Sequence, residues 1–274
     1  MDKTYIGSIG IAGVGMVGEN LARYFREVKS VEPILYDPPK NIGSAEELAE
    51  ADTVFICVNT PRAEDGTADI SQIKAVLDIM KDGQIAVIKS TVPPGTTRAL
   101  AEKYENILFM FNPEFLTEAT AYENMTAPAR QIIGYLEDTE EIAKGIMEIL
   151  PRAQYELICD AEEAEMVKYA SNAFYATKVI FFNELFDICE AAKIDYEKIK
   201  EAMKADPMTG PEHLEIWHKG YRGFGTPEVS KCLPKDVDAL IAFSRLTGKY
   251  PELLRTVTKI NHELAAMTAQ AKAE

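Results

Sequence analysis

The sequence is poor in the residues that hold metal ions and disulfide frameworks. Its 274 residues include three histidines and four cysteines, and no two cysteines form a C-x-x-C pair. A structural zinc site is therefore not expected, and we predict no bound metal. The cysteines are expected to be free thiols of a cytoplasmic protein, at positions Cys57, Cys159, Cys189 and Cys232.

Long apolar runs and an excess of basic charge are also missing. No apolar stretch is long enough to span a bilayer, and the opening MDKTYIGSIGIAG enters strand-like sequence with no room for a cleavable signal. The formal net charge is −15, which disfavours nucleic acid and anionic membranes as partners. We therefore expect a soluble cytoplasmic protein that binds neither of them.

Short apolar runs alternate with helical patterns over residues 1–158. Strands alternating with helices indicate a parallel, doubly wound sheet, so the fold class is α/β with an N-terminal Rossmann-like domain over 1–158. The predicted strands lie at 5–13, 31–37, 53–58, 84–89, 107–111, 131–135 and 155–159, and clear helical patterns lie at 16–28 and 139–150.

Residues 159–274 follow a different pattern and predict an all-helical domain. The segment 161–193 contains no helix breaker, and Asp160 with Glu163 resembles a capping box at its start. One long central helix is therefore expected. Its middle, FYATKVIFF, is apolar on too many faces for a surface helix. We predict that this domain binds substrate and forms a homodimer through 161–193.

A glycine-rich motif, GVGMVG at 13–18, matches G-x-G-x-x-G and stands between a predicted strand and a predicted helix. In that context the motif places a pyrophosphate at a helix N-terminus. An acidic residue at the end of the next strand would accept the ribose hydroxyls and disfavour a 2′-phosphate, so NAD is the expected cofactor. A glycine-rich turn without a ligand is the alternative. The residues predicted to bind NAD here are Gly13, Gly15, Met16, Val17, Gly18 and Asp37.

Three further segments follow predicted strands, and the carboxyl edge of such a sheet is where ligands bind. VNTP (58–61) carries Thr60, and KSTVPPGTT (89–97) carries Thr91. NPEFLTEATA (112–121) carries Glu114 and Glu118, which would lie one turn apart if the segment were helical. A solvated helix face is the plainer interpretation of the two glutamates.

The long helix and the segment after it supply a second group of candidates. Lys168 and Asn172 are four residues apart and share one helix face, with Asn183 near the same stripe. Cys232 precedes Pro234, which suits the first position of a helix. There the helix dipole and Lys231, Lys235 or Lys168 would lower the thiol pKa. Asp236 falls in the first turn. A surface lysine and a core cysteine are the plainer alternatives.

Together these motifs resemble the UDP-glucose/GDP-mannose dehydrogenase family over about residues 5–265. The resemblance rests on GVGMVG, VNTP followed by DGTAD, KSTVPPGTT, NPEFLTEA, EMVKYASNAFYATKVIFFNE, DPMTG, GYRGFG and CLPKD, which occur in this order. It implies an NAD-dependent, four-electron oxidation of the C6 primary alcohol of a UDP-hexose, first of all UDP-glucose, to the uronic acid.

The resemblance also implies roles for individual residues. The Cys232 thiolate attacks an aldehyde, and a thiohemiacetal and then a thioester follow. Lys168 and Asn172 stabilise the oxyanion, while Asp236 assists proton transfer. By the same resemblance, Glu114 lies beside the substrate, and the residues that position the hydrolytic water and contact the cofactor are Thr91 and Glu118.

The sequence departs from the family pattern in four places. The third, UDP-binding domain is not part of the sequence, and the segment between the second and third strands is short. Four extra residues stand between Gly225 and Cys232, and Met208 replaces a usual arginine. Two other functions stay open: a single-step hydroxyacid-type dehydrogenase in which Cys232 is idle, and a non-catalytic NAD-binding or assembly module.

Overall fold

The computed structural model describes residues 6–137, 139–230 and 232–273. Residue 5 of the first predicted strand and Lys231 lie outside this range. The chain divides by packing into two compact units, 1–60 with 69–168 and 61–68 with 169–274. This division falls between Lys168 and Tyr169, inside a long helix. The functional boundary between 158 and 159 stays a prediction.

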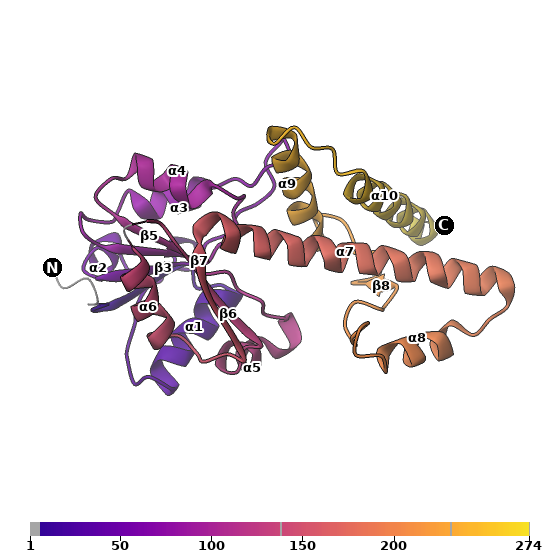
Figure 1. The fold of residues 1–274 in the computed structure, drawn as a ribbon, viewed down its shortest axis with the longest axis horizontal. Coiled ribbons are helices and arrows are strands. Elements are labelled where there is room, and N and C mark those ends of the chain that lie inside the picture. Colours follow the sequence, from indigo (N-terminus) through magenta and orange to yellow (C-terminus); the bar gives the residue numbers. More distant parts are fainter. Residues whose placement is uncertain (1–5, 138, 231, 274) are drawn as a thin grey trace. The chain divides into compact units, whose positions relative to one another are not determined.

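The first unit is built on a seven-stranded sheet (Figure 1) with the order β2-β1-β3-β4-β5-β6-β7. Neighbouring strands are parallel except for β5 and β6. Each predicted strand is present, which confirms the α/β, Rossmann-like fold class. The bounds are β1 (Ile9–Ala12), β2 (Ile34–Tyr36), β3 (Thr53–Ile56), β4 (Ile85–Ile88), β5 (Leu108–Phe111), β6 (Arg130–Tyr135) and β7 (Tyr155–Asp160).

The antiparallel pair β5–β6 corrects the prediction of a wholly parallel sheet. The link between these strands contains the 3₁₀ turn η2 (Glu118–Thr120) and the six-residue helix α5 (Ala121–Thr126). β6 then runs antiparallel to β5, with Met110 opposite Tyr135 and Phe111 opposite Gly134.

Helices cover both faces of the sheet, as a doubly wound fold requires. On one face, α1 (Met16–Glu27), α5 and α6 (Glu140–Ile149) pack against the strands. The other face is covered by α2 (Ala45–Leu48), α3 (Ser71–Leu77), α4 (Thr96–Lys103) and the first turn of α7. The short 3₁₀ turn η1 (Pro38–Lys40) follows β2.

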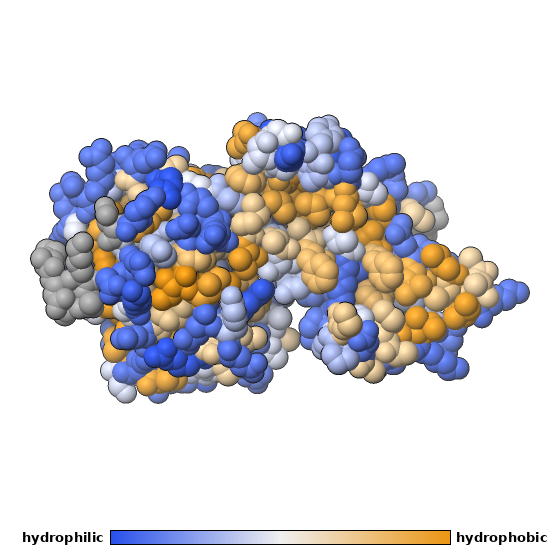
Figure 2. Space-filling view, viewed as in Figure 1, coloured by the Kyte–Doolittle hydropathy of each residue, from blue (hydrophilic) through white to orange (hydrophobic). Residues whose placement is uncertain are grey.

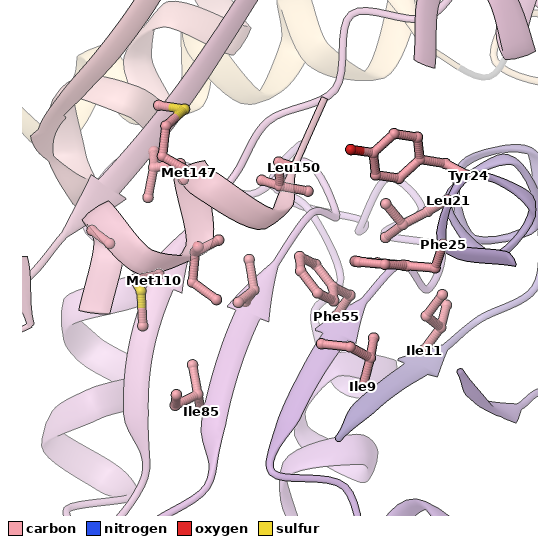
Figure 3. Packing of buried hydrophobic residues seen from close by; sticks show 14 of the residues in the cluster. Ile9, Ile11, Leu21, Tyr24, Phe25, Phe55, Ile85, Met110, Met147 and Leu150 are labelled. Atoms are coloured by element: carbon pink, nitrogen blue, oxygen red, sulfur yellow. The ribbon is translucent and has the colours of Figure 1, made fainter. Parts of the chain in front are cut away.

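The two faces are separated by the alternation of side chains along each strand. Figure 3 shows Leu21 and Phe25 of α1 pointing toward Ile11 and Phe55 of the strands. The neighbouring strand residue Ile56 packs into the opposite cluster. Both clusters are buried, so the sheet forms a rigid base for the loops at its carboxyl edge.

The second unit is assembled around α7 (Ala161–Ala192), which confirms the predicted long helix. At its start, the Asp160 amide donates to the Glu163 carboxylate at 3.2 Å, as a capping box requires. Its apolar residues pack into two buried clusters. The elements around it are α8 (Tyr196–Lys204), α9 (Leu233–Leu246) and α10 (Glu252–Ala273).

A small hairpin corrects the prediction that this domain is all helical. Strands β8 (Trp217–His218) and β9 (Tyr221–Arg222) pair antiparallel. Lys219 and Gly220 between them have φ of 48° and 83°, and a two-residue hairpin turn with positive φ at both positions matches the twist of its strands. Over the residues that the structure describes, no helix is both long and apolar enough to cross a membrane.

Candidate dinucleotide site and candidate active site

The turn between β1 and α1 requires glycine at both ends of its motif. Gly13 has φ +89°, and a Cβ there would lie 2.7 Å from the carbonyl carbon and oxygen of Cys57. A Cβ on Gly18 would overlap the carbonyl oxygen of Gly13. A side chain at either position would therefore push the turn away from β3 or separate α1 from β1.

Gly15 differs from these two glycines because its neighbourhood is open. It is the N-cap residue of α1, and a Cβ there would meet nothing within 4 Å. Met16 and Val17 follow as the first helical residues. Unpaired backbone N–H groups at a helix start attract anions, so this space fits the pyrophosphate of a dinucleotide.

Asp37, directly after β2, fixes the same turn from the other side. Its Oδ2 accepts a hydrogen bond from the Val14 amide at 2.8 Å, and Lys40 Nζ donates to the Val14 carbonyl at 2.5 Å. In the described part of the chain, Oδ1 of Asp37 has no hydrogen-bond partner. One carboxylate oxygen therefore orders the turn, and the other is available for a ribose hydroxyl.

The loops after β3 and β4 are tied to each other at the carboxyl edge of the sheet. The buried Thr60 hydroxyl donates to the Thr91 carbonyl at 2.8 Å, and the Ser90 hydroxyl donates to the Val58 carbonyl at 2.6 Å. The structure thus brings the predicted residues Thr60 and Thr91 together. Their side-chain and backbone groups hold the two loops in one arrangement.

Glu165, which the sequence analysis did not single out, anchors the loop that carries Thr91. Its buried carboxylate accepts hydrogen bonds from the Gly95 amide at 2.6 Å, the Thr97 amide at 2.8 Å and the Thr97 hydroxyl at 2.6 Å. Burial raises its pKa to about 7, against the lowering effect of these donors. The only sequence signal was its position one turn before Lys168.

Lys168 and Glu114 form a largely buried ion pair. Lys168 Nζ donates to Glu114 Oε1 at 2.9 Å and to the Glu114 carbonyl at 2.7 Å, and the Leu116 amide donates to Oε2 at 2.7 Å. Burial alone would raise the pKa of Glu114, but the Lys168 charge and these hydrogen bonds lower it below its usual range. Lys168 is therefore a buried, partnered cation, unlike a surface lysine.

Glu118 does not have the helical relation to Glu114 that the sequence analysis considered. Residues 112–117 are irregular, and Glu118 begins the 3₁₀ turn η2 with an exposed side chain. The proline at 113 has no amide hydrogen to donate and restricts the residue before it. The spacing of four in the sequence therefore does not place both carboxylates on one helix face.

Lys89 is a second buried lysine that the sequence analysis missed. It directly follows β4, and its Nζ donates to Asn112 Oδ1 at 2.6 Å. Asn112 in turn donates to Gln131 Oε1 at 2.9 Å and the Ile132 carbonyl at 2.7 Å. Burial lowers the pKa of Lys89. This network joins the ends of β4 and β5 to the start of β6, close to the segment that carries Glu114.

In the second unit, Cys232 differs from the other cysteines. It is exposed and stands at the N-cap of α9. Pro234 is the second residue of the helix, one position later than predicted. Burial raises the pKa of Cys57 to about 12 and that of Cys159 to about 11, and Cys189 is buried. Burial therefore keeps Cys57 and Cys159 protonated at neutral pH, whereas a helix N-terminus, where Cys232 stands, is a position that favours a thiolate.

Asp236 is a buried carboxylate in the first turn of α9. Asn172 Nδ2 donates to its Oδ2 at 2.5 Å, and Lys235 Nζ donates to its Oδ1 at 2.5 Å. Its own amide donates to the Cys232 carbonyl at 3.0 Å. The structure therefore joins two predicted residues, Asn172 and Asp236, and links Asp236 to the turn that begins with Cys232.

No metal centre is formed by the residues described. Within 6–137, 139–230 and 232–273, no three or more histidine, cysteine, aspartate and glutamate side chains are grouped so that they could hold an ion.

The doubly wound sheet, the three glycines and Asp37 define a dinucleotide-binding protein, and the second unit adds a helical domain with an exposed cysteine. Two family models match it in succession, the NAD binding domain over residues 41–151 and the central domain over residues 162–263. The chain belongs to the UDP-glucose/GDP-mannose dehydrogenase family.

Named relatives agree with this assignment. A UDP-glucose 6-dehydrogenase of Pseudomonas aeruginosa is 36% identical over 233 residues, which cover 79% of this chain and 50% of the relative. One from Bacillus subtilis is 37% identical, with 80% and 50% covered. The solved UDP-glucose dehydrogenase of Pyrobaculum islandicum aligns with a TM-score of 0.76 at 28% identity, covering 96% of this chain and 69% of that structure.

The chain spans about half the length of these curated relatives. The matched half contains the NAD-binding fold and the central helical domain.

Proposed function

We propose that this chain is an NAD-dependent nucleotide-sugar dehydrogenase that oxidises the C6 primary alcohol of a UDP-hexose, first of all UDP-glucose, to the uronic acid. The observation that carries the proposal is the state of Cys232, an exposed thiol at the N-terminus of α9 beside a buried, hydrogen-bonded Asp236. This placement suits a covalent nucleophile better than a structural cysteine.

Bound NAD would accept a hydride in each of the two oxidation steps. The residues of this chain bind and orient it: the α1 N-terminus at Gly15 suits its pyrophosphate, and the free oxygen of Asp37 suits a ribose hydroxyl. The resemblance implies that Thr91 and Glu118 contact the cofactor. We assign Thr60 to the same contact, because its hydroxyl donates to the Thr91 carbonyl.

The first step would yield the C6 aldehyde and release one proton from the alcohol. Lys168 and Asn172, one turn apart on α7, would stabilise the negative charge that develops on the oxygen. Glu114, whose lowered pKa keeps it ionised, holds the Lys168 ammonium in place beside the substrate.

Cys232 would then form the carbon–sulfur bond. Its thiolate adds to the aldehyde carbon, and the resulting thiohemiacetal loses a second hydride and a proton to become a thioester. Water cleaves that thioester to the carboxylic acid and returns the Cys232 thiol. Asp236 would assist proton transfer, and Thr91 with Glu118 would position the water. Covalent capture divides one difficult oxidation into smaller steps.

The test is the number of NADH molecules formed per UDP-glucose consumed, with wild type and Cys232→Ser side by side. The proposal expects two NADH per sugar in the wild type and a loss of the second in the variant. One NADH, unchanged by the substitution, would instead support the single-step dehydrogenase. NAD binding without turnover on any UDP-hexose would support the non-catalytic module. A cytoplasmic location stays a prediction from the sequence.

A further inference from the structure

Two buried asparagines hold the irregular segment that leads to Cys232. Asn183 lies on α7 and Asn261 on α10, and both are at most 1% exposed. Between these helices runs the segment Gly223–Gly225, which follows the hairpin strand β9. We call Asn183, Asn261 and this segment the asparagine clamp.

Asn261 uses both halves of its amide on two consecutive residues. Its Oδ1 accepts a hydrogen bond from the Phe224 amide at 2.8 Å, and its Nδ2 donates to the Gly225 carbonyl at 2.8 Å. These groups belong to no strand or helix, and buried backbone groups need partners. Aspartate has no donor for the Gly225 carbonyl, and leucine has neither a donor nor an acceptor.

The segment is shaped to accept this side chain. Gly223 and Gly225 have φ of +77° and +81°, which L residues with side chains rarely adopt. A Cβ on Gly223 would lie 2.5 Å from Asn261 Oδ1. Asn183 holds the same point from α7, since its Oδ1 accepts from the Gly223 amide at 3.3 Å. The backbone path is therefore fixed from two helices.

A compact turn over residues 226–230 follows the clamp on the side of Cys232. The Ser230 amide donates to the Thr226 carbonyl at 2.8 Å, and buried Ser230 packs against Gly225, where an added Cβ would meet its Cβ at 3.4 Å. Cys232 is the N-cap residue of α9, and its carbonyl accepts a hydrogen bond from the Asp236 amide. The four extra residues noted in the sequence fall between Gly225 and Cys232. The clamp therefore fixes the backbone at the start of this lengthened segment.

We infer that Asn261 is a positioning residue for Cys232, which holds the Gly223–Gly225 backbone and thereby sets where α9 begins. In assigning Cys232 the role of nucleophile, this inference rests on the proposed function. Asn261 itself touches neither substrate nor cofactor in this role. Its effect on the reaction passes through the backbone of the segment and the turn.

The test compares Asn261→Ala with the control Val257→Ala in the full chain. Val257 is a buried core residue of the same helix α10, so its substitution destabilises the helical unit without removing a clamp hydrogen bond. Asn261→Asp, which keeps the acceptor and loses the donor, serves if the alanine variant does not fold. Two readouts are taken: backbone hydrogen exchange by residue, and kcat and KM for NAD with UDP-glucose.

In Asn261→Ala we expect faster exchange at Phe224 and at Asp236, whose amide bonds to the Cys232 carbonyl. We expect kcat to fall by about a hundredfold, the cost of a small misplacement of a reacting group, with KM for NAD unchanged. Asn261→Asp should lie between wild type and Asn261→Ala. Val257→Ala should keep kcat, and it should speed the exchange of the Phe224 and Asp236 amides no more than that of other amides in the helical unit.

Three results would overturn the inference: an unchanged kcat in Asn261→Ala, an equal loss in Val257→Ala, or continued protection of the Asp236 amide in Asn261→Ala. If the wild type turns over no UDP-hexose, the proposed function fails, and the exchange at Phe224 and Asp236 still decides whether Asn261 fixes the start of α9.

Discussion

Glu165 is a buried carboxyl group whose charge state depends on folding. Its pKa rises from 4.5 to about 7 because burial disfavours the ionised form more than its three hydrogen-bond donors favour it. Below pH 4.5 the group is protonated in both the folded and the unfolded chain. As pH rises from 4.5 to 7 the unfolded chain ionises first, so the folded state loses free energy of unfolding over this window.

Glu165→Gln removes that titration. The difference in free energy of unfolding between variant and wild type should shift in favour of the variant by about 3 kcal/mol between pH 4.5 and pH 8. Urea denaturation at several pH values measures this. Glu162→Gln is the matched control, because Arg98 lowers the pKa of Glu162. For this variant the change in the free-energy difference between pH 4.5 and pH 8 should be small and should favour the wild type. A pH-independent difference for Glu165→Gln would contradict the argument.

We predict that the charge of Asp37 determines the choice between NAD and NADP. In Asp37→Asn the amide oxygen can still accept from the Val14 amide, so the turn is kept. The charged hydrogen bond to ribose is lost, at about 1.5–3 kcal/mol, and repulsion of a 2′-phosphate disappears. NAD affinity should fall roughly ten- to a hundredfold while NADP affinity rises. Calorimetric titration of both cofactors measures this, with Asp52→Asn before β3 as the control; equal losses for both cofactors would argue against a ribose contact.

The packing of α7 on β6 depends on the lack of a side chain at Gly134. A Cβ on Gly134 of β6 would lie 2.7 Å from Ala161 Cα and 2.8 Å from Ala164 Cβ. The first turn of α7 can pack on the strand only because both surfaces are small there. Glu165 follows that turn directly, so the packing sets the position of the carboxyl group that anchors the loop of Thr91.

Gly134→Ala should therefore force α7 away from the sheet and cost about 1–3 kcal/mol of unfolding free energy, as overpacking does. Thermal unfolding measures the loss. Gly248→Ala offers a comparison, since a Cβ there meets nothing within 4 Å. Its φ is +70°, so any loss in that variant comes from backbone strain and not from overpacking. If Gly134→Ala keeps the melting temperature of the wild type, the close contact between strand and helix does not constrain α7.

The type of a secondary-structure element could be predicted from the sequence where one pattern continued over many residues. The helix 161–193 was found at Ala161–Ala192, because 32 residues without a breaker leave no other structure. Strand direction was not predictable, since the alternation of side chains along a strand does not depend on the direction of its neighbour, and β6 runs antiparallel to β5. The hairpin was missed because Lys219 takes a positive φ in a turn whose usual sequence signals are Asn-Gly and Asp-Gly.

At the scale of the whole molecule, motif spacing predicted candidate residues but not their partners. Lys168 and Asn172 stood out at four residues apart, yet the structure shows that one holds Glu114 and the other holds Asp236. Lys89 and Asn261 were invisible because a buried lysine or asparagine looks like a surface one until its burial is known. Their roles follow from hydrogen bonds between distant segments.

The exposed surface of the long helix α7 bears on how two copies of the chain would form a dimer. Phe174, Phe181 and Ile188 of α7 are 63%, 54% and 62% exposed and follow one another at intervals of seven residues. Such spacing places them near one line along the helix. Figure 2 shows apolar atoms over the C-terminal part of α7. We propose that this line is the homodimer surface predicted for 161–193.

Phe181→Glu tests that surface. In a two-fold dimer each protomer carries the change, so about 3–6 kcal/mol of apolar burial is lost, and the dissociation constant should rise roughly a hundredfold to ten-thousandfold. Light scattering should then report a monomer that still binds NAD, because residue 181 lies outside the glycine motif. Glu190→Gln, half a turn away around α7, should leave the dimer intact. A wild type that is already monomeric, or a variant that stays dimeric, would place the subunit contact elsewhere.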